Sequence, residues 1–374
     1  MVSASICFVG LDNYPVLNPS RGNEYFGGES VQQTLLAKAF ASLDYRVSMV
    51  VKDHGQRQGE TIGRIKVWKT YAENAGIPVV RFLHPRMSSI LKALENADAD
   101  VYYQSCAGMA TGLVAWHCAR RSRRFIFRLA HDTDCIPGQQ LIRFWRDRKI
   151  YEYGLRRAHF IAAQGTHQVA LLRQNYGLDS LPINMAVDEP AEPDVMQDID
   201  VLWVNNLRGF KRPELAVDLA ARMSARRMVM IGGAVPGNEA LFEEIRARAR
   251  GVPNLEFLGA VPYHEVNAYF ARARVFVNTS DHEGFPNSFL QAWIRGVPVV
   301  SFFDPDGLIK SVGLGHVPRN LTEMNEAVES LLSDESSRAL VSARCRRHAY
   351  DHYAPTAVAR RYVDAGALGV LPPT

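Results

Sequence analysis

Short apolar runs rich in β-branched residues alternate along the whole chain with segments of helical periodicity. This alternation is typical of parallel sheets covered by helices, so it predicts an α/β protein. Strands are expected in the first half over residues 5–10, 45–51, 101–105, 124–131 and 159–165. Helices are expected there over residues 30–43 and 109–122. A second series of strands is expected over residues 200–206, 227–233, 255–260, 274–280 and 298–303.

Between the two series lies an acidic stretch, residues 187–198, which contains two prolines and no apolar period. Such a stretch predicts a linker. A chain of 374 residues also exceeds the length over which one core usually keeps growing. We therefore expect an N-terminal domain over 1–186, a C-terminal domain over 187–350, and a helical segment over 351–374 that packs back toward the first domain. Ligands should bind beyond the carboxyl ends of the strands, in a cleft between the two domains.

Composition narrows the class of protein. No apolar run reaches the roughly 20 residues that span a bilayer, and the first residues lack a signal peptide pattern, so a cytoplasmic protein is expected. Five cysteines without a C-x-x-C pair argue against a disulfide framework and a structural zinc site. The net charge of +4 is too weak to indicate nucleic-acid binding. Anionic small substrates and a membrane surface both stay open as partners.

The stretch 280–301, SDHEGFPNSFLQAWIRGVPVVS, contains the first candidate chemistry. It predicts a loop, then a helix over 288–295 with Asn287 as its N-cap and Gly296 just beyond its end. The unpaired N–H groups of the first turn would favour a phosphate. Glu283 lies just ahead, placed to accept hydrogen bonds from hydroxyls rather than to contact phosphate, and Gln291 lies one turn into the helix. The alternative is a loop acid and a cap that are only solvated.

Three further stretches carry candidate residues. The loop after the strand at 200–206 supplies Arg208, Lys211 and Arg212, which suit a diphosphate leaving group, although a solvated basic loop is the alternative. Gly27 and Gly28 precede the first helix of the N-terminal domain, where glycine lets the backbone approach a ligand closely. His131 and Asp132 follow a strand at its carboxyl end; a histidine at such a place is as often structural.

Taken together, these stretches resemble the retaining glycosyltransferases of family 4, which have the GT-B fold of two Rossmann-like domains facing across a cleft. The resemblance covers nearly the whole chain, and residues 280–301 are its most specific part because they are similar to the family's E-x7-E region. It implies catalytic roles for Glu283, His131 and Lys211. It implies donor binding by Gly27, Gly28, Asn206, Arg208, Lys211, Gly284, Phe285, Pro286, Asn287, Ser288 and Gln291.

Two residues depart from the family pattern. Asn206 stands where the family usually has an arginine, and Arg208 is displaced by two positions. Gln291 stands where the family usually has the glutamate that grips both ribose hydroxyls. An amide accepts from one hydroxyl and donates to the other, so ribose binding should persist but weaken.

The motif D-x-D, through which other glycosyltransferases hold a divalent ion, occurs at residues 132–134, 198–200 and 304–306. So short a pattern recurs by chance, and the family that the chain resembles needs no metal. We therefore expect no metal and no cofactor besides the substrate nucleotide sugar.

The resemblance implies a hexosyltransferase of glycan or polysaccharide biosynthesis that uses a nucleotide diphosphate sugar, with UDP favoured and GDP open. A catalytically weakened nucleotide-sugar binding or scaffold subunit is the alternative. An NAD-dependent oxidoreductase fits poorly, because neither FVGLDN nor IGGAVPGN completes G-x-G-x-x-G. The acceptor would be a saccharide or a lipid-linked saccharide. Residues 141–158 combine basic and aromatic side chains that could rest on anionic lipid at the inner face of the membrane, but their apolar side is slightly favoured as core.

Overall fold

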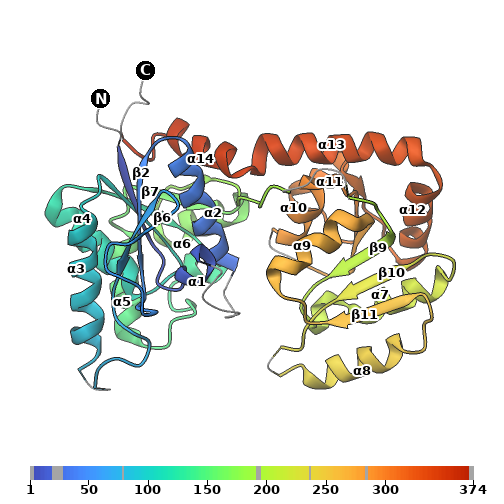
Figure 1. The fold of residues 1–374 in the computed structure, drawn as a ribbon, viewed down its shortest axis with the longest axis horizontal. Coiled ribbons are helices and arrows are strands. Elements are labelled where there is room, and N and C mark those ends of the chain that lie inside the picture. The colour runs from blue at the N-terminus through green and yellow to red at the C-terminus, as the bar shows by residue number, and fades with distance from the viewer. Residues whose placement is uncertain are drawn as a thin grey trace. The chain divides into compact units, whose positions relative to one another are not determined.

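The computed structural model describes residues 4–18, 28–77, 80–190, 195–235, 237–282 and 285–369 (Figure 1). The chain divides into two compact units, each with its own sheet. Unit 1 contains Met1–Ala186 and Pro355–Thr374, and unit 2 contains Val187–Ala354. The chain returns to unit 1 four residues later than the expected boundary at 350, because helix α13 (Glu335–Tyr353) continues to Tyr353. Pro355 then begins helix α14 (Pro355–Asp364), at the position in a helix that tolerates proline best.

The sheet of unit 1 has the strand order β3-β4-β2-β1-β5-β6-β7-β8. All neighbouring strands are parallel except the pair β3 and β4. Each strand predicted in this half is present, while β3, β4 and β8 were not predicted; β3 and β8 are only two residues long. The strands are β1 (Ser5–Val9), β2 (Arg46–Val51), β3 (Thr61–Ile62), β4 (Ile65–Lys69), β5 (Val101–Ser105), β6 (Arg124–Arg128), β7 (Phe160–Ala163) and β8 (Leu181–Pro182).

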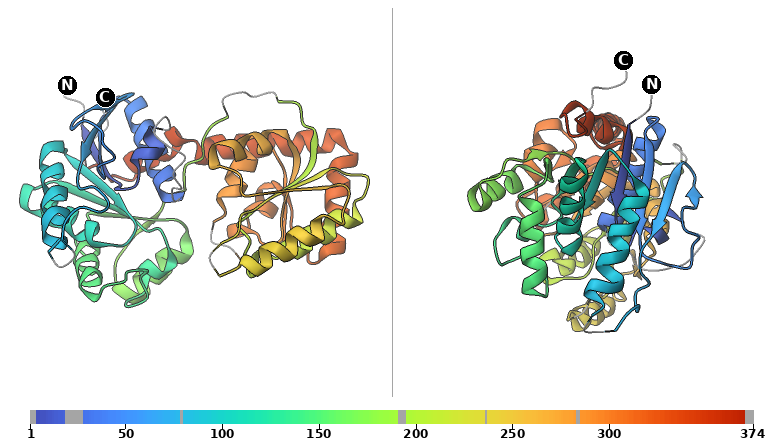
Figure 2. Two further views of the ribbon diagram at one scale, coloured as in Figure 1. Left: turned by 60° about the horizontal axis from the view of Figure 1, so that its bottom comes forward. Right: turned by 90° about the vertical axis from the view of Figure 1, so that its left-hand side faces the viewer.

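Helices cover both faces of this sheet (Figure 2). Alternate residues of β1 point to opposite faces, so Phe8 joins a core with α2 and α14, and Cys7 joins a second core with α3, α4 and α5. Helix α14 therefore packs against α2 although the two lie at opposite ends of the chain. The helices are α1 (Tyr14–Leu17), α2 (Gly28–Ser42), η2 (Phe82–Met87), α3 (Ser88–Ala97), α4 (Met109–Arg121), η3 (Asp132–Cys135), α5 (Trp145–Leu155) and α6 (Thr166–Tyr176).

The sheet of unit 2 has the order β11-β10-β9-β12-β13-β14, and its neighbouring strands are parallel. Every strand of the predicted second series is present, and β14 is an addition. The strands are β9 (Ile199–Val204), β10 (Met228–Ile231), β11 (Leu255–Gly259), β12 (Ala273–Asn278), β13 (Val299–Ser301) and β14 (Gly315–His316). The helices besides α13 are η4 (Gly209–Lys211), α7 (Pro213–Arg222), α8 (Glu239–Ala249), α9 (Tyr263–Arg272), α10 (Asn287–Ile294), η5 (Pro305–Gly307), α11 (Leu308–Val312) and α12 (Leu321–Ser333).

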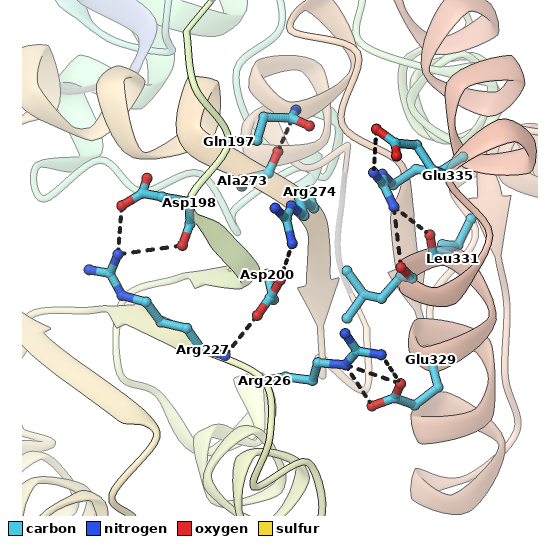
Figure 3. A network of polar contacts seen from close by, with 12 residues as sticks. Gln197, Asp198, Asp200, Arg226, Arg227, Ala273, Arg274, Glu329, Leu331 and Glu335 are labelled. Carbon is cyan, nitrogen blue, oxygen red and sulfur yellow. Dashed lines mark hydrogen bonds and ion pairs between the residues drawn. The ribbon is translucent and has the colours of Figure 1, made fainter.

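Ion pairs join the amino ends of the strands of unit 2 (Figure 3). The carboxylate of Asp198 accepts hydrogen bonds from Arg227 at 2.6 Å and from Arg272 at 2.7 and 2.6 Å. Asp200 accepts from Arg274 at 2.7 Å and from the backbone N–H of Arg227 at 2.9 Å. The hydrogen bonds from Arg272, followed by those from Arg227, hold the pKa of the Asp198 carboxyl well below its usual range. The network ties β9, β10 and β12 together at the edge opposite their carboxyl ends.

Candidate functional site

The strand order of unit 2 creates a topological switch point. From the central strand β9 the chain moves outward to β10 and β11, and it then returns to place β12 on the other side of β9. The loops that follow β9 and β12 therefore emerge side by side at the carboxyl edge of the sheet. This is where open α/β sheets bind their ligands. These loops, residues 205–212 and 279–286, contain most of the candidate donor-binding residues.

Hydrogen bonds tie the two loops together. The hydroxyl of Thr279 donates to the backbone oxygen of Lys211 at 2.8 Å and accepts from the buried indole N–H of Trp203 at 2.9 Å. The backbone N–H of Asp281 donates to the oxygen of Phe210 at 2.9 Å. The hydroxyl of Thr279 thus connects the backbone of Lys211 to the buried Trp203 of β9. Residues such as Trp203 and Thr279, whose side chains do this positioning, carried no signal in the sequence because their partners are far along the chain.

The three cations of the first loop differ in their surroundings. Arg212 donates to Glu214 at 2.6 Å and to Asp281 at 3.0 Å, and these carboxylates raise the pKa of its guanidinium. Arg212 is therefore paired with two carboxylates of this unit, and its predicted contact with a diphosphate stays a prediction. Arg208 is exposed. Lys211 is half-buried, with its Nζ 5.0 Å from the centre of the Phe210 ring.

Helix α10 begins at Asn287, and Pro286 occupies the N-cap position with an extended backbone at φ −71° and ψ 121°. The prediction that Asn287 caps the helix is therefore wrong by one residue, because Asn287 already has helical geometry. No side chain caps the first turn within the described residues. Gly296 follows the helix at φ 71°, as predicted. Asn287 is exposed and Ser288 half-buried, so this end of the helix is accessible from solvent.

Aromatic rings pack around the amino-terminal end of α10. The ring of Phe285 lies 5.7 Å from that of Tyr353 and 6.4 Å from that of Trp293, measured between centroids. Trp293 is fully buried and packs edge-on against Phe289. The candidate loop residue Phe285 is thus held by the end of α13, which the sequence did not indicate.

Gln291 lies in the middle of α10 and is 7% exposed. Its Nε2 donates to the side-chain oxygen of Asn267 on helix α9 at 3.2 Å. The amide is thus oriented by a residue that sequence reasoning missed. Its predicted contact with a ribose stays a prediction.

The candidates of unit 1 lie at the carboxyl edge of its own sheet. His131 follows β6 and is exposed, and its backbone N–H donates to the buried carboxylate of Asp134 at 3.1 Å. Gly28 is the exposed first residue of α2. Next to it, the Oε1 atom of Glu29 lies 3.8 Å from Nε of Arg128. Arg128 is only 2% exposed. Burial raises the pKa of the Glu29 carboxyl, and the nearby Arg128 charge opposes that rise.

Three candidate residues, Gly27, Glu283 and Gly284, lie outside the described residues. Their roles stay predictions. Asn206 is described and exposed, directly after Asn205 at the end of β9.

Each D-x-D motif has carboxylates engaged within the chain. Asp134 accepts from the backbone N–H groups of Ala130 and His131, and Asp304 accepts from that of Ile309 at 2.8 Å. The carboxylates at 198 and 200 belong to the ion-pair network of Figure 3. Over the described ranges, no group of three or more His, Cys, Asp or Glu side chains could hold a metal ion. The expectation that catalysis needs no metal stays a prediction.

Comparison with known proteins agrees with this architecture. Residues 198–334 match the family model described as Glycosyl transferases group 1. The O-antigen chain mannosyltransferase B of Escherichia coli is 26% identical over 141 residues, which are 37% of this chain and 36% of that protein. The match thus spans about a third of the curated relative. Within the described residues, no helix is both long and apolar enough to span a bilayer.

Solved structures are similar over nearly the whole chain. Sucrose-phosphate synthase from Thermosynechococcus elongatus has a TM-score of 0.71 at 16% identity, covering 97% of this chain and 98% of that one. Anabaena Alr3699/HepE in complex with UDP and glucose has a TM-score of 0.68 at 15% identity, covering 97% and 99%. WaaG, a glycosyltransferase involved in lipopolysaccharide biosynthesis, has a TM-score of 0.59 at 14% identity, covering 96% and 99%. The predicted GT-B fold, with two Rossmann-like α/β domains, is confirmed.

Proposed function

We propose that this GT-B protein, whose second unit matches the group 1 glycosyltransferases, is an active retaining glycosyltransferase. It moves a hexose from a nucleotide diphosphate sugar to a saccharide or lipid-linked saccharide acceptor in glycan biosynthesis. UDP is the favoured nucleotide, GDP stays open, and no metal is required. The similarity to a structure that holds UDP and glucose supports the choice of UDP.

The observation that carries this proposal is the switch point between β9 and β12. There the cations Lys211 and Arg208 and the exposed start of α10 belong to neighbouring loops. A departing diphosphate gains negative charge as the glycosidic bond opens. Fixed cations and the positive end of a helix dipole stabilise that charge more in the transition state than in the ground state. Glu283 and His131 keep the roles that the resemblance implies, next to the transferred sugar.

The acceptor proposal draws on two relatives. One is named for O-antigen chains and another for lipopolysaccharide biosynthesis. A saccharide held on a lipid at the inner face of the membrane would fit such a pathway, with the protein bound there peripherally.

A degenerate nucleotide-sugar binding or scaffold subunit is the second candidate, favoured by Asn206 and Gln291. Release of nucleotide diphosphate from a panel of UDP-, GDP- and ADP-sugars distinguishes the two. An active enzyme releases one nucleotide specifically, and Lys211→Ala and Glu283→Ala abolish that release. Lys92→Ala, at an exposed lysine of unit 1, serves as the control. Tight donor binding without release would support the scaffold, and loss of release in EDTA would refute metal independence.

A further inference from the structure

Two neighbouring loops of unit 1 are joined by glutamine side chains at the carboxyl edge of its sheet. Strands β6 and β7 are parallel neighbours, so the loops that follow them emerge at the same edge. Nε2 of Gln164, directly after β7, donates to the backbone oxygen of Ala130 at 3.1 Å. Nε2 of Gln168, in the first turn of α6, donates to Oδ1 of Asp132 at 3.1 Å. The loop that carries Asp132 is therefore held from α6.

The orientation of the Gln168 amide is fixed by its surroundings. Gln168 is only 4% exposed, and its Oε1 accepts the backbone N–H of Gln164 at 2.9 Å. Because an amide oxygen cannot donate a hydrogen bond, this contact leaves Nε2 to face Asp132. Burial of an amide is unfavourable unless its polar atoms are hydrogen-bonded, and both ends of this amide are. A buried side chain thus holds a surface carboxylate in place.

The two carboxylates of the sequence DTD, residues 132–134, differ in their surroundings. Asp134 is 1% exposed and accepts hydrogen bonds from two backbone N–H groups. The side chain of Asp132 is 52% exposed. Its Oδ2 lies 3.7 Å from Nε2 of His167, which is too long for a hydrogen bond, and it accepts none from any residue that the structure describes. One oxygen of Asp132 is therefore available to a ligand, while Gln168 holds the other.

The charge of this edge limits the kind of ligand. Residues 129–135 and 164–168 contain two aspartates, two histidines and no lysine or arginine. Arg128, just before the first loop, is buried and lies beside Glu29. Histidine is mostly neutral above its usual pKa of about 6.5, so the edge is negative at neutral pH. A negative edge repels anions, and a carboxylate accepts hydrogen bonds from hydroxyls, so a neutral ligand that carries hydroxyls is favoured.

We propose that Asp132 binds a hydroxyl of the saccharide acceptor, and that Gln168 is its positioning residue. Oδ2 accepts the hydrogen of the hydroxyl while Gln168 holds Oδ1, so less side-chain freedom is lost when the ligand binds. A hydrogen bond to a charged oxygen is stronger than one to a neutral oxygen. The negative edge selects a neutral sugar unit over a uronic acid or a phosphorylated sugar. The inference rests on the proposed function, since it names the class of sugar that the enzyme accepts.

Saccharide binding to the full chain tests the site without turnover. The probes are the methyl glycosides of glucose, galactose, mannose and glucuronic acid, titrated by saturation-transfer NMR. At least one neutral glycoside should bind, and more tightly than the glucuronide. Asp132→Asn should weaken its binding about tenfold, because the amide oxygen still accepts from Gln168 but an N–H group replaces the outward oxygen. Gln168→Met should weaken it less, since the charge stays and only its orientation is lost.

Matched controls keep the test specific. Asp179→Asn alters an exposed carboxylate of unit 1 that is paired with Arg173, and Gln174→Met alters an exposed amide of α6. Both should leave glycoside binding unchanged. Thermal melting shows which variants fold, and Asp132→Asn decides alone if Gln168→Met does not. Binding of no neutral glycoside, tighter binding of the glucuronide, or equal affinities of Asp132→Asn and Asp179→Asn would overturn the proposal.

Kinetics separate this proposal from the proposed function. With the neutral glycoside as acceptor, Asp132→Asn and Gln168→Met should raise the acceptor KM and leave the donor KM unchanged, a split that a merely structural role would not produce. A raised donor KM with an unchanged acceptor KM would overturn the proposal in favour of the donor sugar. If the glycoside binds through Asp132 but no donor is cleaved, only the proposed function fails. If a donor is cleaved while Asp132→Asn binds the glycoside as the wild type does, only the acceptor site fails.

Discussion

Replacing His348 with phenylalanine is expected to reduce the loss of stability that acid causes in this protein. His348 lies on α13, and its ring packs edge-on against Trp293 of α10, with centroids 6.1 Å apart. Its Nε2 is buried and finds no hydrogen-bond partner within the described residues. Burial, aided by the nearby His352, lowers the pKa of His348 from 6.5 to about 4. The folded protein therefore resists protonation of this ring.

The direction of the pH effect follows from this lowered pKa. Above pH 6.5 the ring is neutral in both the folded and the unfolded chain, so it contributes no pH dependence. As the pH falls below 6.5, the unfolded chain takes up a proton that the folded chain does not, until the pH approaches 4. One pKa unit corresponds to about 1.4 kcal/mol. The free energy of unfolding should therefore fall by at most about 3 kcal/mol across this range, and by less where solvent reaches the ring.

Urea unfolding at several pH values between 7.5 and 4, followed by tryptophan fluorescence, measures this effect. His348→Phe keeps an aromatic ring against Trp293 and removes the titrating group, so its free energy of unfolding should fall less than that of the wild type. His167→Gln, at an exposed histidine of α6, is the control and should follow the wild type. Parallel losses in the wild type and His348→Phe would refute the reasoning. Because α10 also carries the candidate donor site, nucleotide affinity should weaken over the same pH range.

Three further substitutions probe the site and its support. Gly232→Ala should weaken UDP binding about tenfold by calorimetry, because its Cβ would collide with the backbone oxygen of Asn205 and overpacking costs about 1–3 kcal/mol. Gly251→Ala, after α8 and outside the loops that follow β9 and β12, is its control, since a Cβ there would come no closer than 3.4 Å to its nearest neighbour, and equal affinities of the two variants would contradict the expectation. Arg128→Met should destabilise the protein by about 3–5 kcal/mol in urea unfolding, because it leaves Glu29 without its buried partner. Adding Glu29→Gln should restore part of that loss, and no restoration would mean that the pair is not coupled. Gln291→Glu should tighten UDP binding about fivefold by replacing a neutral hydrogen bond with a charge-assisted one, and unchanged affinity would place Gln291 away from the ribose.

The hydrophobic pattern was enough to predict the long strands of both sheets, since a buried parallel strand needs a continuous apolar run. It did not predict the five-residue β4, in which the exposed Lys66 separates the buried Ile65 and Val67. It also did not predict β3 or β8, which are two residues long and stabilised by pairing with neighbours. The start of α10 was placed to within one residue, because Pro286 and Asn287 both suit the beginning of a helix. Local sequence does not decide between two such adjacent positions.

The sequence by itself determined the two α/β domains, the family resemblance and the loops that carry the candidate site, because these depend on local periodicity and on short motifs. Only the tertiary structure decided the partners of individual arginines. Arg212 is paired with Asp281, 69 residues away, and Arg128 donates to Tyr362, 234 residues away. Likewise, only the packing of α5 separated the buried Tyr151 from the exposed Trp145, six positions apart in one amphipathic segment. A side chain's charge and exposure are set by neighbours that the fold brings together, and the spacing of residues along the chain does not contain that information.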